Sequence, residues 1–281
     1  MLRPKTDRSS LPEYSPKSKL PTTLEQIVAD TRAALPSLHA RKAQVERAAA
    51  DRPLPPSFHA ALTRSDLAVI AEVKRRSPSA GTINADLDPA ARAAAYADAG
   101  AAAVSVLTDV AHFGGSIDDL RAAAICVAIP CIRKDFIVDE LQIVEAKAVG
   151  AAAVLLIVRS LPLPRLRALR EFTESLGLGA LVEAHDAREL DIALESGASI
   201  VGVNSRDLDT FRIDTAAAWT LMSRIPVSCI AVAESGMAAR ADVEAAAARG
   251  ADAVLVGTAL SALGEPSAAV AALAGVPRQG R

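Results

Sequence analysis

Apolar and small residues recur along this chain in a pattern that repeats. Four segments each carry a Gly-Ala step, a few small residues and an apolar, mostly β-branched run: residues 98–107, 148–157, 195–203 and 249–257. Their glycines stand where a helix is expected to end in the left-handed conformation: Gly100, Gly150, Gly197 and Gly250. The run after each glycine is typical of a buried parallel strand. The repeat therefore predicts the helix-to-strand junctions of a βα architecture.

Further apolar runs between these junctions complete a set of eight predicted strands; they cover residues 67–73, 129–133, 179–183 and 227–233. Helical spacing of apolar residues fills the gaps, over residues 89–99, 116–127, 139–149, 163–176, 187–196, 215–223, 239–249 and 267–273. Eight strands alternating with eight helices predict an α/β fold, a (β/α)8 TIM barrel, which typically needs about 250 residues. A doubly wound open sheet is the main alternative, but no Gly-rich dinucleotide fingerprint supports it.

The ends of the chain and its composition refine this prediction. We expect a disordered tail over residues 1–20, an N-terminal helical extension over 21–60 that covers the bottom or rim, and a catalytic barrel over 61–281. The net charge of -2, without a basic stripe, argues against a nucleic-acid partner. The three cysteines form no metal or disulfide motif, and the sequence shows no secretory leader, so we expect a cytoplasmic protein. No apolar run is long enough to span a membrane, so we expect no membrane segment.

The first predicted strand ends in two charged residues that share a face. Glu72 and Lys74 are two positions apart, and alternate residues of a strand point to the same side. A buried carboxylate and ammonium are costly unless they are paired or used. The mouth of this strand therefore indicates a site for chemistry.

Polar residues also stand at the ends of later strands: Lys134, Glu183, Asn204, Arg206, Glu234, Ser235, Gly257 and Thr258. Each alone is explained as well by a solvated charge, a structural ion pair or a helix cap. In a barrel, however, all strand ends meet at one mouth, where active sites lie. Neighbouring lysines and glutamates shift one another's pKa values, which favours acid–base chemistry. No cluster has metal-ligand spacing, so we expect no metal; among the histidines only His185 is near a strand end, as a supporting residue at most.

Two loops are candidates for phosphate binding. One begins at Ser235-Gly236 after the seventh strand, and the other at Gly257-Thr258 after the eighth. Phosphate sites of such barrels often use these loops, through backbone N–H groups.

The motifs at these positions resemble the indole-3-glycerol phosphate synthase family, over about residues 24–264. They are IAEVKRRSPSAG (70–81), LTDVAHFGGSIDDL (107–120), PCIRKDFIVDELQIVEA (130–146), LVEAHDAREL (181–190), VGVNSRDLDTF (201–211), AESGM (233–237) and ADAVLVGTAL (251–260). The first and third are specific to the family among phosphate-binding barrels. The chain departs from the family at Ser205, often Asn, and at Thr258, often Ser; neither position removes a residue with a chemical role.

The resemblance implies a cofactor-free ring closure. In this family 1-(2-carboxyphenylamino)-1-deoxyribulose 5-phosphate loses carbon dioxide and water to give indole-3-glycerol phosphate, a step of tryptophan biosynthesis. By position, Lys134 matches the general acid, Lys74 the lysine that contacts substrate anions, and Glu183 the acid–base group of dehydration. Glu72 would orient Lys74.

The resemblance also implies a set of substrate-binding positions. Asn204, Arg206 and Glu234 would position the substrate and its carboxylate. The rim residues that would hold the substrate, chiefly its phosphate, are Ser77, Ser235, Gly236, Gly257 and Thr258. The apolar walls for the aromatic ring would come from Phe113, Phe136, Leu155 and Leu255.

Two other functions remain open at this point. One is phosphoribosylanthranilate isomerase, which uses a Cys after the first strand and an Asp after the sixth, where this chain has Lys74 and Asn204 or Arg206. The other is a non-catalytic barrel kept for interaction, which the presence of Lys134, Lys74 and Glu183 disfavours. We expect a monomer or a weak homo-oligomer.

Overall fold

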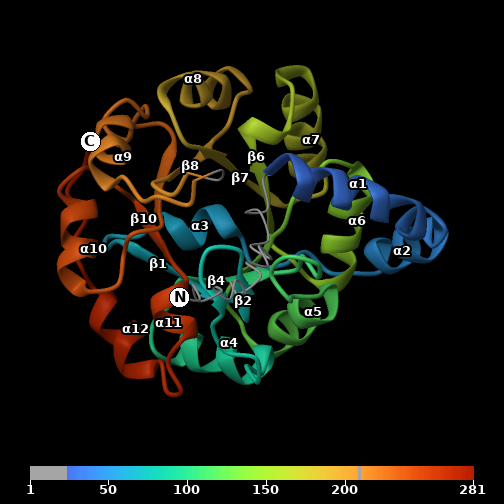
Figure 1. Cartoon of the computed structure of the whole chain (residues 1–281), viewed down its shortest axis with the longest axis horizontal. Coiled ribbons are helices and arrows are strands. Elements are labelled where there is room, and N and C mark those ends of the chain that lie inside the picture. The colour runs from blue at the N-terminus through green and yellow to red at the C-terminus, as the bar shows by residue number, and fades with distance from the viewer. Residues whose placement is uncertain (1–23, 208–209) are drawn as a thin grey trace, which may run out of the picture.

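The computed structural model describes residues 24–207 and 210–281, and their parallel strands form a closed barrel (Figure 1). The strands are β1 (Ala68–Val73), β4 (Ala103–Leu107), β5 (Cys131–Lys134), β6 (Ala153–Ile157), β7 (Gly179–Ala184), β8 (Ile200–Asn204), β9 (Ile230–Glu234) and β10 (Ala253–Val256). Each pairs with the next along the chain, and β10 closes the ring against β1. The prediction of a (β/α)8 barrel rather than an open sheet is confirmed.

A ring of helices surrounds these strands in Figure 1. It consists of α4 (Pro89–Asp98), α5 (Ile117–Cys126), α6 (Glu140–Val149), α7 (Leu163–Ser175), α8 (Ala187–Glu195), α9 (Thr215–Met222), α10 (Arg240–Ala247) and α12 (Ser267–Leu273). Helix α4 begins as expected, because the Asp88 side chain accepts hydrogen bonds from two backbone N–H groups and Pro89 follows. The four junction glycines have φ between 80° and 97°, which confirms their left-handed conformation.

Helices that precede the barrel pack on its side and across one end. Helices α1 (Leu24–His39) and α2 (Lys42–Ala50) lie along the flank, and Leu38 and Val45 pack against Leu141 of α6. The short α3 (Phe58–Leu62) lies where β6 and β7 begin, since a Cβ at Gly179 would meet Phe58. The expected tail over residues 1–20 lies outside the described residues, and the domain boundary at residue 60 stays a prediction.

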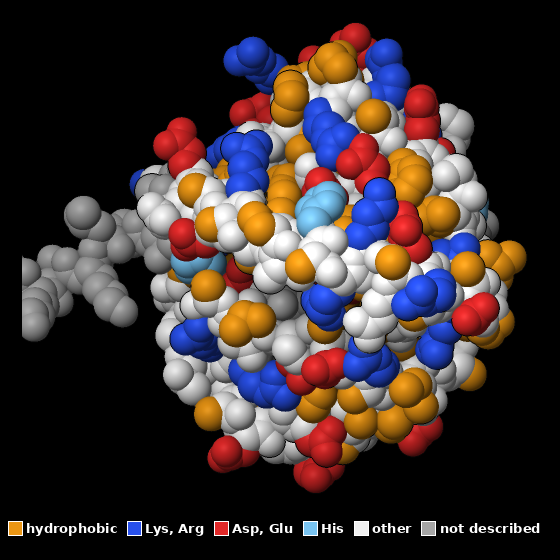
Figure 2. Space-filling view, turned by 90° about the vertical axis from the view of Figure 1, so that its right-hand side faces the viewer, with side chains coloured by type: hydrophobic (Ala, Val, Ile, Leu, Met, Phe, Trp, Pro, Cys, Tyr) orange, Lys and Arg blue, Asp and Glu red, His pale blue; other side chains and the backbone are white. Residues whose placement is uncertain are grey.

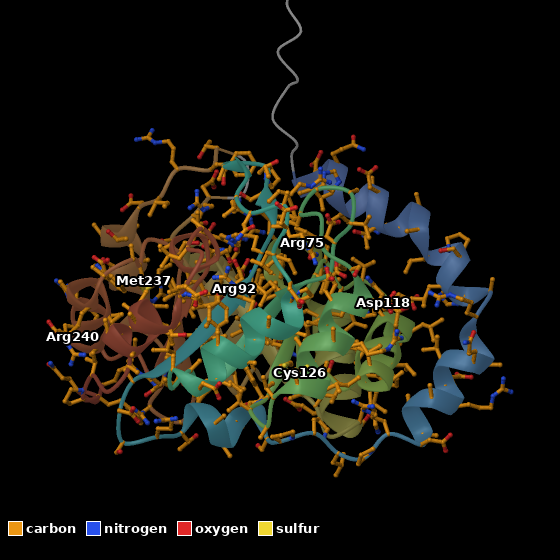
Figure 3. All side chains as sticks on the ribbon, turned by 90° about the horizontal axis from the view of Figure 1, so that it is seen from below. Arg75, Arg92, Asp118, Cys126, Met237 and Arg240 are labelled. Atoms are coloured by element: carbon orange, nitrogen blue, oxygen red, sulfur yellow. The ribbon has the colours of Figure 1, made fainter. Side chains whose placement is uncertain are left out.

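Several short elements were not predicted. They are α3, the hairpin of β2 (Arg76–Ser77) and β3 (Gly81–Thr82), the 3-10 turn η1 (Val158–Ser160) and the short helix α11 (Thr258–Ser261). Figure 3 shows the barrel side-on, with Arg75 toward the end from which the hairpin projects and α3 at the opposite end.

On the face that carries α1 and α2, basic and acidic side chains are interspersed (Figure 2). None of the helices in the described ranges is long and apolar enough to cross a membrane.

Candidate active site

A cavity of about 470 Å³ opens at the carboxyl ends of the strands. It is lined by every site residue predicted from the sequence: Lys134, Lys74, Glu183, Glu72, Asn204, Ser77, Phe113, Arg206, Glu234, Ser235, Gly236, Leu255, Gly257 and Thr258. The structure therefore brings together residues that are scattered over almost the whole chain. Cross-strand register explains why: Glu183 is opposite Gly202, and Asn204 is opposite Glu234, so these positions share the inner face.

Lys134, the last residue of β5, lies between two carboxyl groups. Its Nζ is 3.2 Å from Oε2 of Glu183 and 3.6 Å from Oε2 of Glu234. Burial opposes the charge of the ammonium, but the acidic groups of Glu183, Glu234 and Glu72 outweigh it and raise the pKa of Lys134. An ammonium has three N–H donors, so one stays available for a group in the cavity. Lys134 can therefore donate a proton to a bound molecule.

Glu183 and Glu234 are buried side by side and respond differently to that burial. Burial favours the neutral form of Glu183, but Lys134 and His185 lower its pKa below the ordinary value. Burial and the charge of Glu183 together raise the pKa of Glu234 well above its ordinary value. The pKa values of the two neighbouring carboxyl groups are thus shifted in opposite directions. Groups with separated pKa values of this kind are typical of acid–base catalysis.

Glu72 and Lys74 form the ion pair that their spacing indicated. The Nζ of Lys74 is 2.7 Å from Oε1 of Glu72, and both side chains are largely buried. On the outer face of β5, by contrast, Arg133 pairs with Asp135 and with Glu145 of α6. The end of β5 therefore places a lysine on the inner face and an arginine on the outer face.

Arg206 is a cation at the cavity without an acidic partner. It forms no ion pair with any carboxylate in residues 24–207 or 210–281, and within these ranges its guanidinium donates one hydrogen bond, to the Phe211 carbonyl at 3.2 Å. Burial lowers the pKa of Arg206, although Glu72 opposes that effect. Its backbone N–H donates to Oδ1 of Asn204 at 3.0 Å, which fixes the start of the loop. A half-buried guanidinium of this kind is suited to bind an anionic group.

Aromatic side chains form one wall of the cavity. The rings of Phe113 and Phe136 have centroids 6.0 Å apart with an interplanar angle of 38°. Phe113 is held by Asp109, whose Oδ1 accepts the backbone N–H groups of His112 and Phe113 at 2.6 and 3.0 Å. With Leu155 and Leu255, this wall offers an apolar face to a planar ring.

The loop after β9 has an unusual backbone. Ser235 and Gly236 both have positive φ, 65° and 76°, and Ser235 is one of only two such non-glycine residues in the described chain. A Cβ at Gly236 would come within 2.8 Å of Thr215, so this position requires glycine. Strained backbone often marks a functional site. Together with the turn at Gly257–Thr258, the loop lines the cavity rim, and turns of this kind can bind an anion through backbone N–H groups.

Comparisons with known proteins agree with this geometry. Residues 24–273 match the family model described as indole-3-glycerol phosphate synthase. The chain is 48% identical to the indole-3-glycerol phosphate synthase of Mycolicibacterium vanbaalenii over 254 residues, 90% of this chain and 93% of that protein. It is also 48% identical to indole-3-glycerol phosphate synthase 2 of Streptomyces coelicolor over 83% of this chain and 91% of that one. The chain belongs to the indole-3-glycerol phosphate synthase family.

Solved structures that are distant in sequence show the same fold. One is a thiamine phosphate pyrophosphorylase from Pyrococcus furiosus, with a TM-score of 0.56 and 16% identity, over 74% of this chain and 94% of that one. Another is a mandelate oxidase mutant, with a TM-score of 0.55 and 20% identity, over 82% and 91% of the two chains. At these identities the likeness concerns the barrel alone.

Two glycines leave room for the carboxyl groups of Glu234 and Glu72, a role that the sequence analysis missed. A Cβ at Gly202 would lie 2.2 Å from Oε1 of Glu234, and one at Gly257 would lie 2.1 Å from Oε1 of Glu72. Gly257 was assigned only to the phosphate rim, and Gly202 was not singled out. The available signal was an inward glycine in the otherwise β-branched strand IVGVN.

The cavity offers no obvious metal centre. Among the described residues no group of three or more His, Cys, Asp or Glu side chains could hold a metal ion. Glu72, Glu183 and Glu234 are instead engaged by Lys74 and Lys134. The donor set therefore fits acid–base chemistry by amino-acid side chains.

Proposed function

We propose that this chain converts 1-(2-carboxyphenylamino)-1-deoxyribulose 5-phosphate to indole-3-glycerol phosphate, and that it is a carboxy-lyase of tryptophan biosynthesis. The observation that carries the proposal is the cationic Lys134, held between Glu183 and Glu234 in a cavity with an aromatic wall. Such a cavity suits a substrate that combines a planar ring, a ketone and anionic ends. Family membership supports the same reaction.

Ring closure needs an acid at the ketone. The ring carbon that bears the carboxylate attacks the ketone carbon, and Lys134 gives a proton to the ketone oxygen as the new carbon–carbon bond forms. The carboxylate then leaves as carbon dioxide, and its bonding electrons restore the aromatic ring. A proton donor of this kind contributes about 10²–10⁴-fold to the rate.

Dehydration follows ring closure. The new hydroxyl group takes up one proton and leaves as water, while a base removes another proton from the neighbouring ring carbon and the double bond of the indole forms. Glu183 is suited to that role, because its lowered pKa keeps it ionised and it lies at the cavity floor beside Lys134. The same carboxyl group then returns the proton to solvent.

Three groups of residues hold the substrate in place. Arg206 and Lys74 bind its carboxylate, with Glu72 orienting Lys74 and Asn204 fixing the loop of Arg206. The rings of Phe113 and Phe136 contact the anthranilate ring. The loops at Ser77, Ser235–Gly236 and Gly257–Thr258 bind the phosphate, chiefly through backbone N–H groups.

The experiment is to incubate the purified protein with the ribulose phosphate and follow indole fluorescence. Formation of indole-3-glycerol phosphate, confirmed by mass, is expected; no product at saturating substrate would refute the proposal. A parallel assay with phosphoribosylanthranilate tests the isomerase alternative. We expect no turnover there, since no cysteine of the described residues lines the cavity.

We also propose that the enzyme acts in the cytoplasm as a monomer or weak homo-oligomer. Residues of a single chain, from β1 to β10, line the cavity around the whole barrel mouth, so the proposed chemistry does not require a residue from a second copy. Sedimentation at micromolar concentration should give a mass near 29.1 kDa. A stable larger species whose dissociation abolishes turnover would contradict it.

A further inference from the structure

His185 lies directly behind the proposed base and outside the cavity. It follows β7, and its side chain is only 3% exposed. Its Nε2 is 3.4 Å from Oε1 of Glu183, while the other oxygen of Glu183, Oε2, is 3.2 Å from Lys134. Glu183 is therefore approached by a cationic or potentially cationic group at each of its two oxygens.

The imidazole is fixed from its other side by α8. Nδ1 of His185 is 2.9 Å from Oε2 of Glu189, which also accepts the backbone N–H of His185 at 2.9 Å. Oε1 of Glu189 accepts from Nε of Arg159 at 2.6 Å, and Arg159 also contacts Asp207 at 3.3 Å. This chain of contacts fixes the ring plane and leaves Nε2 buried 3.4 Å from Oε1 of Glu183, a charge contact and not a hydrogen bond among the described residues.

Carboxyl groups on two sides favour the imidazolium. Burial opposes its charge, but Glu183 and Glu189 outweigh burial and raise the pKa of His185 to about 9. Other titratable groups come from the neighbouring strands: Lys134 of β5 and Glu234 of β9 both lower the pKa of Glu183, while Glu72 of β1 acts on Lys134 and Glu234. Burial raises the pKa of Glu183, so a second cation beside Lys134 helps to keep this carboxyl group ionised.

We propose that His185 is a positioning residue, which as an imidazolium anchored by Glu189 holds Glu183 oriented and ionised for its work as the base. This inference rests on the proposed function, since it concerns the same carboxylate. A histidine that merely fills space would leave the ionisation of Glu183 unchanged, and this difference can be measured.

The first measurement does not depend on catalysis. In the ¹⁵N-histidine NMR spectrum, His185 should stay protonated through neutral pH and titrate near pH 9, whereas Glu183→Gln should lower that midpoint. A His185 that is neutral at pH 7 in the wild-type protein would overturn the proposal, whether or not the protein forms indole.

The second measurement is the pH profile of kcat/KM for His185→Gln, beside His59→Gln as the control at an exposed position of α3. Loss of the positive charge raises the pKa of Glu183, so the acidic limb should move up by about one pH unit or more. At pH values below the shifted limb, kcat of the variant should be about tenfold lower than that of the wild type. KM should change little, because His185 does not line the cavity.

A third variant, Glu189→Gln, keeps the imidazole but removes its anchor and should move the limb in the same direction by less. Unshifted limbs in both variants, with wild-type turnover present, would refute the role of His185. Absence of turnover in the wild-type protein would instead refute the proposed function. Equal unfolding midpoints for His185→Gln and wild type exclude a folding defect as the cause.

Discussion

The two ends of the barrel use buried charge differently. At the amino-terminal end, Asp252 is buried, and its carboxylate accepts hydrogen bonds from the Ala231 backbone N–H at 2.8 Å and from Arg281 at 2.9 Å. It also accepts a hydrogen bond from Arg278. At the carboxyl-terminal end, Lys134 has contacts of 3.2 and 3.6 Å, and Oε1 of Glu234 has no hydrogen-bond partner among the described residues. At the amino-terminal end, the buried charge joins separate segments of the chain. At the carboxyl-terminal end, Lys134 and Glu234 keep hydrogen-bonding atoms available, and a substrate can bind to them.

The largest expected effect belongs to the carboxyl-terminal end. Lys134→Met should lower kcat by about 10²–10⁴-fold while the protein still folds, because it removes the proposed acid and roughly keeps the volume. Steady-state kinetics with circular dichroism checks this. Lys42→Met, at an exposed i,i+4 pair with Glu46, is the control and should be silent. Near-normal turnover of the Lys134 variant would show that another group is the acid.

The opposite result is expected for Asp252→Asn. It leaves Arg281 buried without its carboxylate, so urea unfolding should show a loss of about 3 kcal/mol in the free energy of unfolding. Turnover per folded molecule should stay unchanged. Asp191→Asn removes an exposed pair with Arg224 and should cost about 1 kcal/mol or less. If Asp252→Asn also reduces kcat in the folded protein, the separation between the two ends does not hold.

Gly202→Ala tests whether the cavity floor requires an empty position. The new methyl group would meet Oε1 of Glu234, so that carboxyl group must move, and kcat should fall by about tenfold, the equivalent of a barrier change of about 1.4 kcal/mol. Gly264→Ala places the same methyl group in open space and should have no effect on kcat. Equal kinetics for the two variants would show that catalysis does not depend on the space that Gly202 leaves for Glu234.

The smallest effect concerns the stability of the acid pair. Because the folded protein raises the pKa of Glu234, its stabilising contribution is present below the unfolded pKa and is lost as pH rises through the folded value. Above pH 5, the titration of Glu234 should therefore lower the free energy of unfolding of the wild-type protein by up to about 1.4 kcal/mol per pH unit. Glu234→Gln should remove that slope. Urea titrations at several pH values measure it; the surface variant Glu244→Gln should keep the wild-type slope.

The sequence predicted the barrel and the cavity lining because both depend on local patterns. Apolar periodicity and the junction glycines mark the strands, and each charged residue at a strand end needs only barrel closure to reach the mouth. The short α3 and the β2–β3 hairpin escaped because they contain too few residues to show a period. The contacts of Gly202 with Glu234 and of His185 with Glu189 escaped for another reason. They depend on strand register and side-chain direction, which a residue pattern does not encode.

The closure of β1 against β10 has a consequence for synthesis of the protein. Glu72 comes from the first barrel strand, yet the glycine that leaves room for its carboxyl group, Gly257, follows the last one. Ser261 and Tyr96 both donate to the Glu72 carbonyl, so the seam joins segments from opposite ends of the chain. A ribosome must therefore release nearly the entire polypeptide before the pocket exists. Until then the charged strand ends lie open to water, and chaperones can still bind the unfinished sheet.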